Sequence, residues 1–255
     1  MNHLTTAVEA GIQRIQINRP DKKNALTIAM YAALADALAA ADADAAVRVT
    51  LLHGAGDCFT AGNDVQDFLA NPPTAENRPA FRFLETISHA TKPIVAAVHG
   101  VAIGVGTTML AHCDLVYAAE GTRFQVPFVN LGLSPEGASS VLLPALAGYQ
   151  RAAELLMLGE PFDAARAREI GLVNEVVPAA RLLETATAAA QKLAAQPPES
   201  LRLTKRLLKR ALLPQIEAAL AEELKIFVAR LGSPEAKEAF TAFVEKRAPD
   251  FSRFR

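Results

Sequence analysis

The sequence has no tryptophan, only two cysteines, no long apolar run and almost no excess of charge. Its 26 Lys and Arg residues against 27 Asp and Glu residues leave a net charge of −1, which gives no basic face for nucleic acid. No apolar run approaches the roughly 20 residues that cross a bilayer. Cys58 and Cys113 lie in apolar segments, so buried thiols in a reducing compartment are favoured over a disulfide framework. We expect neither a nucleic-acid nor a membrane partner.

Recognisable targeting patterns are also absent. Residues 1–11 lack the basic segment followed by an apolar one that is typical of a signal peptide. Phe254-Arg255 does not match a peroxisomal address of the Ser-Lys-Leu type. We therefore expect a soluble protein of the cytoplasm.

The residues that are present favour a mixed fold. The 255 residues, 51% of them hydrophobic and many of them alanine, suffice for one α/β domain with or without a helical appendage. Residues 27–43 have helical periodicity, with Thr27 as a suitable N-cap. Short apolar runs predict strands at 11–18, 47–53, 93–99 and 114–119. The strand at 93–99 is apolar enough to be buried on both faces. Strands that alternate with helices predict the α/β class.

Two proline-rich stretches interrupt these patterns. Residues 70–79 are polar and we expect them to form an exposed loop. After Gln196-Pro197-Pro198, three helical patterns follow with no strand between them, at 200–212, 215–231 and 234–246. The sequence therefore predicts an α/β core over residues 1–198 and a helical region over residues 199–255.

A first glycine-containing segment, Cys58 to Asp64 (CFTAGND), follows the predicted strand at 47–53. Gly62 would let the backbone approach a ligand and leave amide N–H groups pointing outward, with Asp64 placed as the N-cap of the next helix. The alternative is an ordinary strand-to-helix turn, which the segment taken alone favours.

A second such segment, His99 to Gly106 (HGVAIGVG), follows the predicted strand at 93–99 and opens a helix. It lacks the Gly-Lys-Ser/Thr of a phosphate-binding loop and the glycine spacing of a dinucleotide site. What remains is a helix N-terminus with free amides, which suits an anion or a polarised carbonyl.

A third segment, Asn130 to Gly137 (NLGLSPEG), places Glu136 in a turn before a helical pattern. It is not a nucleophile elbow, because the second glycine comes one residue late. Glu136 is either a solvated carboxylate in the first helical turn or a catalytic group, and the segment alone leaves both open.

The adjacent His112, Cys113 and Asp114 do not predict a metal site. Consecutive residues cannot all face one ion from a strand or helix, and neither a paired His motif nor a Cys-x-x-Cys occurs. We expect no metal.

Together, in their order and spacing, these segments resemble the enoyl-CoA hydratase/isomerase (crotonase) family over nearly the whole chain. The matching segments are the opening loop with Asn18-Arg19-Pro20 and Lys23-Asn24-Ala25-Leu26, the two oxyanion segments Phe59 to Asp64 and Lys92 to Asp114, the passage Gly159 to Val177, and Phe243-Val244-Glu245-Lys246-Arg247 in the last helix.

This resemblance implies a spiral of strand-strand-helix turns followed by a helical region that builds trimers, often paired into hexamers. It implies a coenzyme A thioester as substrate and no permanently bound cofactor. The backbone N–H groups of Asn63 and Val105 would bind the thioester oxygen, although small residues are common at the position of Asn63. The C-terminal contacts often come from a neighbouring subunit in this family. The other positions assigned to substrate or coenzyme A are Lys23, Ala25, Ala61, Gly62, Asp64, Gly104, Thr108, Phe128, Phe243 and Lys246.

The carboxylates decide which reaction the resemblance favours. Family hydratases use two Glu residues to activate water and manage the α-carbon proton, and the matching positions here are Thr108 and Phe128. The run from Pro127 to Gly137 resembles the Δ3,Δ2-enoyl-CoA isomerase branch, in which the residue matching Glu136 is the sole base. We predict that Glu136 moves a proton from C2 to C4 of a 3-enoyl thioester while the oxyanion hole holds the dienolate. Loss of the two carboxylates would also dry the pocket and raise the pKa of Glu136 by desolvation.

Two other functions stay open. One is a hydratase, or another acyl-CoA lyase or hydrolase, which would add water to crotonyl-CoA faster than it isomerises. The other is a non-catalytic acyl-CoA-binding homologue, which would bind ligand without introducing solvent deuterium at C2 or C4. The retention of Glu136 beside two glycine-rich turns ranks this non-catalytic alternative last.

Overall fold

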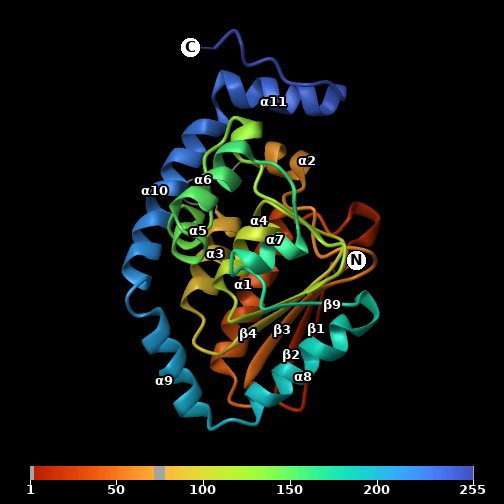
Figure 1. Cartoon of the computed structure of the whole chain (residues 1–255), viewed down its shortest axis with the longest axis vertical. Coiled ribbons are helices and arrows are strands. Elements are labelled where there is room, and N and C mark those ends of the chain that lie inside the picture. Colours follow the sequence, from red (N-terminus) through yellow and green to blue (C-terminus); the bar gives the residue numbers. More distant parts are fainter. Residues whose placement is uncertain (1–2, 72–77, 255) are drawn as a thin grey trace.

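The computed structural model describes residues 3–71 and 78–254 and contains two β-sheets surrounded by helices (Figure 1). The larger sheet has six strands in the order β1-β2-β3-β4-β6-β9. β1 and β2 are antiparallel, and the later neighbours pair in parallel. The six strands are β1 (Leu4–Glu9), β2 (Ile12–Ile17), β3 (Val49–Gly54), β4 (Ile94–Val98), β6 (Leu115–Ala119) and β9 (Glu175–Val177).

The centre of this sheet is buried on both faces, because alternate residues of a strand point to opposite sides. In β4, Val95 and Ala97 join the apolar cluster beneath α8 (Leu182–Ala194). The remaining residues of β4 join the main core, which is shared with α1 (Ile28–Ala43) and α3 (Pro79–His89). The prediction that the third strand is buried on both faces is confirmed.

The predicted strands and the first predicted helix are also confirmed, with ends shifted by at most two residues. The four predicted strands are β2, β3, β4 and β6, and the predicted helix at 27–43 is α1. Thr27 caps α1, because its side chain accepts a hydrogen bond from the backbone N–H of Met30. The sequence does not predict β1, in which every residue after Leu4 is exposed, so no apolar alternation marks it.

The smaller sheet explains the spiral arrangement. It consists of β5 (Val101–Ile103), β7 (Arg123–Gln125) and β8 (Phe162–Asp163), with β7 in the middle. β5 follows β4 and β7 follows β6, while Thr60, which follows β3, forms a bridge to Ala102. Successive strand-strand turns therefore stack on one another, and the predicted α/β spiral is confirmed.

One detail of the second glycine-rich segment differs from the prediction. It does not pass directly from strand to helix, because β5 intervenes before α4 (Val105–Thr108). Gly100, at φ +64°, turns the chain where any side chain would overlap the Asp57 carbonyl. A strand of three residues is too short for its periodicity to be read from sequence.

Short helices fill the connections between the sheets. α2 (Val65–Ala70) follows the first glycine-containing segment, and the centre of the predicted loop at 70–79 lies outside the described residues. The others are α5 (Ser139–Ala147), α6 (Tyr149–Leu158), α7 (Ala164–Glu169) and the 3-10 turns η1 (Pro20–Lys22), η2 (Met109–His112), η3 (Val129–Leu131) and η4 (Ala179–Arg181).

The helical C-terminal region is present as predicted. α9 (Pro198–Lys209) and α10 (Leu213–Leu231) run along one side of the molecule, and α11 (Pro234–Glu245) lies across one end (Figure 1). α10 also contributes Ile216, Leu220 and Phe227 to the main core. A division at residue 198 and a role of these helices in oligomerisation stay predictions. Within residues 3–71 and 78–254, no helix combines the length and apolar character needed to cross a membrane.

Candidate active site

The first glycine-containing segment holds Asn63 with its backbone N–H directed away from its neighbouring chain. The N–H of Leu26 donates to the Gly62 carbonyl at 2.7 Å, and the N–H of Asp64 donates to the Leu26 carbonyl at 2.9 Å. In such a parallel bridge the N–H of the central residue, Asn63, points to the other side. This N–H has no acceptor within the part of the chain that the structure describes.

The second segment offers a comparable N–H at Val105. Gly104, at φ +56° and ψ −120°, precedes α4, and its carbonyl accepts from the N–H groups of Thr107 and Thr108 at 2.9 and 3.0 Å. Val105 is the first helical residue, so its N–H has no intrahelical partner. None of the described residues supplies another acceptor.

The two segments lie against each other. Gly62 has φ +87°, and a Cβ on it would lie 2.6 Å from the carbonyl oxygen of Ile103, the residue before Gly104. Glycine therefore permits both the backbone conformation and the close approach. As a result, the N–H groups of Asn63 and Val105 belong to neighbouring turns.

Glu136 is buried and hydrogen-bonded to the helix that begins at Val105. Its side chain is 6% exposed, and its Oε1 accepts a 2.6 Å hydrogen bond from the Thr108 hydroxyl. Thr108 lies three residues after Val105 in α4, and residues at this spacing share a helix face. The solvated helix-start alternative for Glu136 is thus wrong.

The protein environment makes Glu136 a weak acid. Burial raises the pKa of its carboxyl from 4.5 to about 8, because the ionised form loses its hydration. The hydrogen bond from Thr108 opposes this rise, and the negative charge of Glu223 adds to it. A carboxyl that titrates near neutral pH is well matched to general-base chemistry.

Tyr31 holds the side chain of Asn63, and the sequence does not predict this role. Tyr31 is fully buried in α1, and its hydroxyl donates a hydrogen bond to the side-chain oxygen of Asn63. Burial raises the pKa of Tyr31, and the negative charge of Glu136 raises it further, so the two groups are close enough to interact. A tyrosine in the apolar stripe of a helix is the available sequence signal, since a buried hydroxyl requires a partner.

Glu223 is the second residue that sequence reasoning misses. It lies in α10 among Ile216, Leu220 and Phe227, which recur at helical spacing and are buried. Glu223 is itself buried, and both its carboxylate oxygens accept hydrogen bonds from the turn that follows Glu136. A carboxylate inside an apolar stripe is the signal that marks it.

The comparisons with known proteins agree with this geometry. A family model described as "Enoyl-CoA hydratase/isomerase" matches residues 7–253. The chain belongs to the enoyl-CoA hydratase/isomerase family. The predicted resemblance is thereby confirmed.

Individual members of the enoyl-CoA hydratase/isomerase family carry different activity names. The chain is 36% identical over 245 residues to "Enoyl-CoA delta isomerase 2" of Rattus norvegicus, covering 94% of this chain and 62% of that protein. It therefore spans less than two thirds of that relative. The chain is 31% identical to "2,3-dehydroadipyl-CoA hydratase" of Escherichia coli (strain K12), covering 98% of this chain and 99% of that protein.

A solved structure of the family has the same fold. The crystal structure of an enoyl-CoA hydratase/isomerase from Pseudoalteromonas atlantica T6c is 42% identical, with a TM-score of 0.93, and covers 98% of this chain and 100% of that chain. Isomerase and hydratase names occur at similar identities. The likeness thus establishes the family and the fold but leaves the reaction open between the two activities.

The opening loop, which the family resemblance assigns to coenzyme A, lies against the first segment. The Ala61 N–H donates to the Lys23 carbonyl at 2.9 Å, and the Lys23 side chain is exposed. Arg19 donates to the Ala25 carbonyl at 3.0 Å and to the Asp64 carboxylate at 2.6 Å. Asp64 also caps α2, as predicted, so its carboxylate fixes the loop and the helix together.

The remaining predicted positions fall in two places. Phe128 is buried just before η3, and Gly104 and Thr108 flank the turn of α4. Phe243 is 62% exposed on α11, and Lys246 is exposed at the end of that helix. In the described residues no hydrogen bond connects these two C-terminal side chains to the opening loop, and their contact with coenzyme A stays a prediction.

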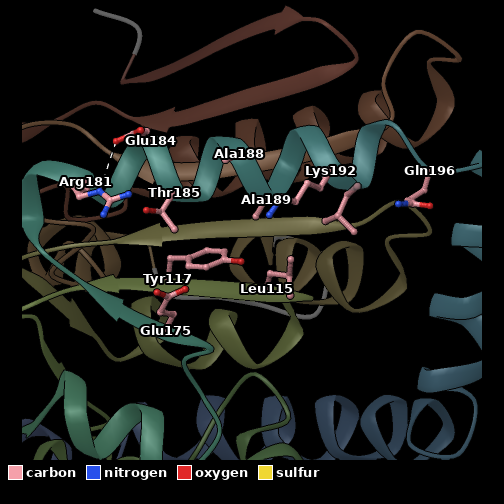
Figure 2. Close-up of a pocket in the computed structure, with 11 residues that line it drawn as sticks. Leu115, Tyr117, Glu175, Arg181, Glu184, Thr185, Ala188, Ala189, Lys192 and Gln196 are labelled. Atoms are coloured by element: carbon pink, nitrogen blue, oxygen red, sulfur yellow. Dashed lines mark ion pairs between the residues drawn. The ribbon is translucent and has the colours of Figure 1, made fainter.

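A separate cavity is lined by none of the predicted site residues. It has a volume of about 370 Å³ and lies between α8 and the strands β6 and β9 (Figure 2). Leu115 and Tyr117 line one side of it and Thr185 and Lys192 the other, while Arg181 pairs with a glutamate of α8 at its rim. Its lining is mixed in polarity, with charges of both signs.

Proposed function

We propose that the protein is a Δ3,Δ2-enoyl-CoA isomerase, which moves the double bond of a 3-enoyl thioester to the 2-position. The observation that supports this best is the asymmetry of the Glu136 carboxylate. Oε1 accepts from Thr108, whereas Oε2 has no partner among the described residues. One oxygen is fixed and the other is available to a proton.

The proposed reaction needs one base and one oxyanion site. Ionised Glu136 removes a proton from C2, and the electrons of the C–H bond form a dienolate whose oxygen accepts from the N–H groups of Asn63 and Val105. Protonated Glu136 then returns the same proton at C4, which leaves the double bond between C2 and C3. Each oxyanion donor contributes about 3 to 4 kcal/mol to transition-state stabilisation in comparable sites.

The neighbouring residues support proton transfer over water addition. Hydration uses a second carboxylate to manage water, and the positions that family resemblance assigns to the hydratase pair are Thr108 and Phe128. Thr108 is bound to Glu136, and Phe128 is buried and apolar. Such a pocket stabilises a protonated Glu136 and offers little to orient water.

The proposed substrate is an acyl-CoA, and no permanently bound cofactor is needed for this chemistry. The opening loop with Lys23 and Ala25 lies beside the segment of Asn63, which places an exposed cation near the proposed thioester site. In a homotrimer or a dimer of trimers, Phe243 and Lys246 of a neighbouring subunit would complete the nucleotide site.

Two substrates offered side by side test the reaction. We expect 3-hexenoyl-CoA to be converted to 2-hexenoyl-CoA faster than crotonyl-CoA is hydrated. The products are separated by chromatography after equal incubation. Faster hydration would instead favour the second candidate, an enoyl-CoA hydratase, to which the relative named as a hydratase lends support.

Glu136→Gln tests the assigned base. We expect turnover of 3-hexenoyl-CoA to fall about 10²- to 10⁴-fold, because the amide cannot accept the C2 proton, while affinity for the acyl-CoA changes little. Glu222→Gln is the matched control, since Glu222 is exposed on α10. Near-wild-type turnover by Glu136→Gln would refute the assignment, and binding without deuterium exchange by the wild type would identify a non-catalytic homologue.

A further inference from the structure

The C-terminal region reaches the proposed catalytic turn through Glu223. This side chain is 6% exposed and extends from α10 to the residues that follow Glu136. Its Oε2 accepts from the Ala138 N–H at 2.7 Å, and its Oε1 accepts from the Ser140 N–H at 3.1 Å and hydroxyl at 2.5 Å. Three donors from one turn therefore converge on one carboxylate.

The turn needs such support. Gly137 has φ +71° and Ala138 has φ +55°, and the latter is an unfavourable conformation for a residue with a side chain. A Cβ on Gly137 would lie 2.9 Å from the Thr108 hydroxyl oxygen, so the turn is packed tightly against α4. Strained backbone of this kind persists where surrounding contacts hold it.

Other elements face Glu136 with little competing charge. Thr108 of α4 donates to it, and the buried Tyr31 of α1 is neutral because its pKa is raised. His112 of η2 donates through Nε2 to the Gly137 carbonyl at 2.8 Å, and burial lowers its pKa to about 4, which leaves it uncharged near neutral pH. Glu223 of α10 is the ionisable group that, among residues 3–71 and 78–254, accepts hydrogen bonds from this turn.

We propose that Glu223 is a positioning residue, which fixes the turn after Glu136 so that the free carboxylate oxygen meets the substrate. This inference rests on the proposed role of Glu136 as the base. It makes α10, which the sequence separates from the α/β core, a structural part of the active site. Glu223 does not touch the substrate in this role.

Glu223→Gln is the direct test. The amide keeps one acceptor oxygen but presents N–H groups to a backbone donor, so either Ala138 or Ser140 loses its partner. We expect kcat for 3-hexenoyl-CoA to fall about 10- to 100-fold with little change in KM. Burial raises the pKa of Glu223 itself, and wherever Glu223 is ionised the removal of its charge lowers the pKa of Glu136, so the rising limb of the kcat/KM profile moves to lower pH.

Two further variants separate position from charge. Glu223→Asp keeps the charge but shortens the reach, and we expect a lowered kcat with an unshifted pH profile. If Glu223→Gln does not fold, Glu223→Asp alone decides, and wild-type kcat in that variant overturns the proposal. The control Glu222→Gln removes an adjacent exposed charge and should leave both kcat and the pH profile unchanged.

A spectroscopic measurement keeps this inference separate from the proposed function. The infrared difference between two proteins that differ only in Glu136 or Gln at that position isolates the carboxyl band of Glu136. This band reports the titration of Glu136 without any substrate. A shift of this titration to lower pH in Glu223→Gln shows that Glu223 acts on the Glu136 carboxyl even if the wild type does not isomerise, so the two proposals can fail separately. Superimposable titrations in Glu223→Gln and Glu222→Gln, together with equal kcat in the two variants, would overturn it.

Discussion

The two halves of the proposed site are held in place by different means. The segments around Gly62 and Gly104 are fixed by their own backbone, through a bridge to Leu26 and a close approach to Ile103. The turn that carries Glu136 is fixed from outside, by Thr108 of α4 and Glu223 of α10. The oxyanion half therefore depends on its backbone and on the absence of a side chain at Gly62, whereas the base half depends on a few distant side chains.

This difference follows from what each half must do. Backbone N–H groups are rigid donors and need no side chain, so glycine and a strand end suffice to aim them. A base needs a tuned pKa, and tuning requires burial and neighbouring polar groups. Three substitutions would break or sharpen this contrast, in order of expected effect on stability.

Gly62→Ala should cause the largest loss. A Cβ at this site would meet the Ile103 carbonyl oxygen at 2.6 Å at a φ of +87°, so we expect a decrease of about 3 to 4 kcal/mol in the free energy of unfolding. Chemical denaturation measures it. Gly121→Ala is the control, because Gly121 has φ +79° but, apart from its chain neighbours, no atom of the described residues lies within 4 Å of a Cβ there. Equal losses in both variants would show that close approach is not what fixes the oxyanion half.

Glu136→Gln should have a smaller effect on stability, and one that depends on pH. The pKa of Glu136 is raised to about 8 in the folded protein, so between pH 4.5 and about 8 the native state binds more protons than the unfolded state, and wild-type stability falls as the pH rises. Glutamine has no carboxyl to ionise, so the variant does not lose stability in this way as the pH rises. We expect the variant to be more stable than the wild type by about 2 to 3 kcal/mol at pH 7, with the difference vanishing toward pH 4.

Thermal and denaturant unfolding of the two proteins at several pH values checks this expectation. A constant difference across the range would mean that the folded protein does not raise the pKa of Glu136. In that case burial would not set the pKa of Glu136, and the proposed difference between the oxyanion half and the base half would be wrong.

Tyr31→Phe should have the smallest effect. The change removes the hydroxyl that donates to the Asn63 side chain, and we expect a loss of about 1 kcal/mol in the free energy of unfolding. The bridge to Leu26 orients the backbone around Asn63 without using the Asn63 N–H, so kcat should fall only a few-fold. Tyr149→Phe, at a side chain that is 67% exposed, is the control. A loss of activity comparable to that of Glu136→Gln would mean that Tyr31 positions the oxyanion half through its side chain.

The sequence predicts well those features that depend on local patterns. The apolar alternation of β2, the Thr27 and Asp64 caps and the glycine turns around Gly62 and Gly104 each arise within a few residues. Resemblance to a family then singles out Glu136, which spacing alone leaves undecided. These features are predictable because short-range geometry determines them.

The features that the sequence does not predict depend on contacts between distant residues. β5, β7 and β8 have two or three residues each and exist through pairing with one another. Tyr31 meets Asn63 across 32 positions, and Glu223 meets Ala138 across 85. No periodicity connects such pairs, so only the folded chain brings them together.

The single free oxygen of Glu136 has a stereochemical consequence under the proposed function. One carboxylate approaches the acyl chain from one side, so the hydrogen that leaves C2 and the hydrogen that arrives at C4 occupy the same face of the molecule. A buried carboxyl also exchanges slowly with water, so a deuterium placed at C2 should appear at C4 in a substantial share of turnovers. The handedness of the labelled product would thus record the side from which Glu136 acts.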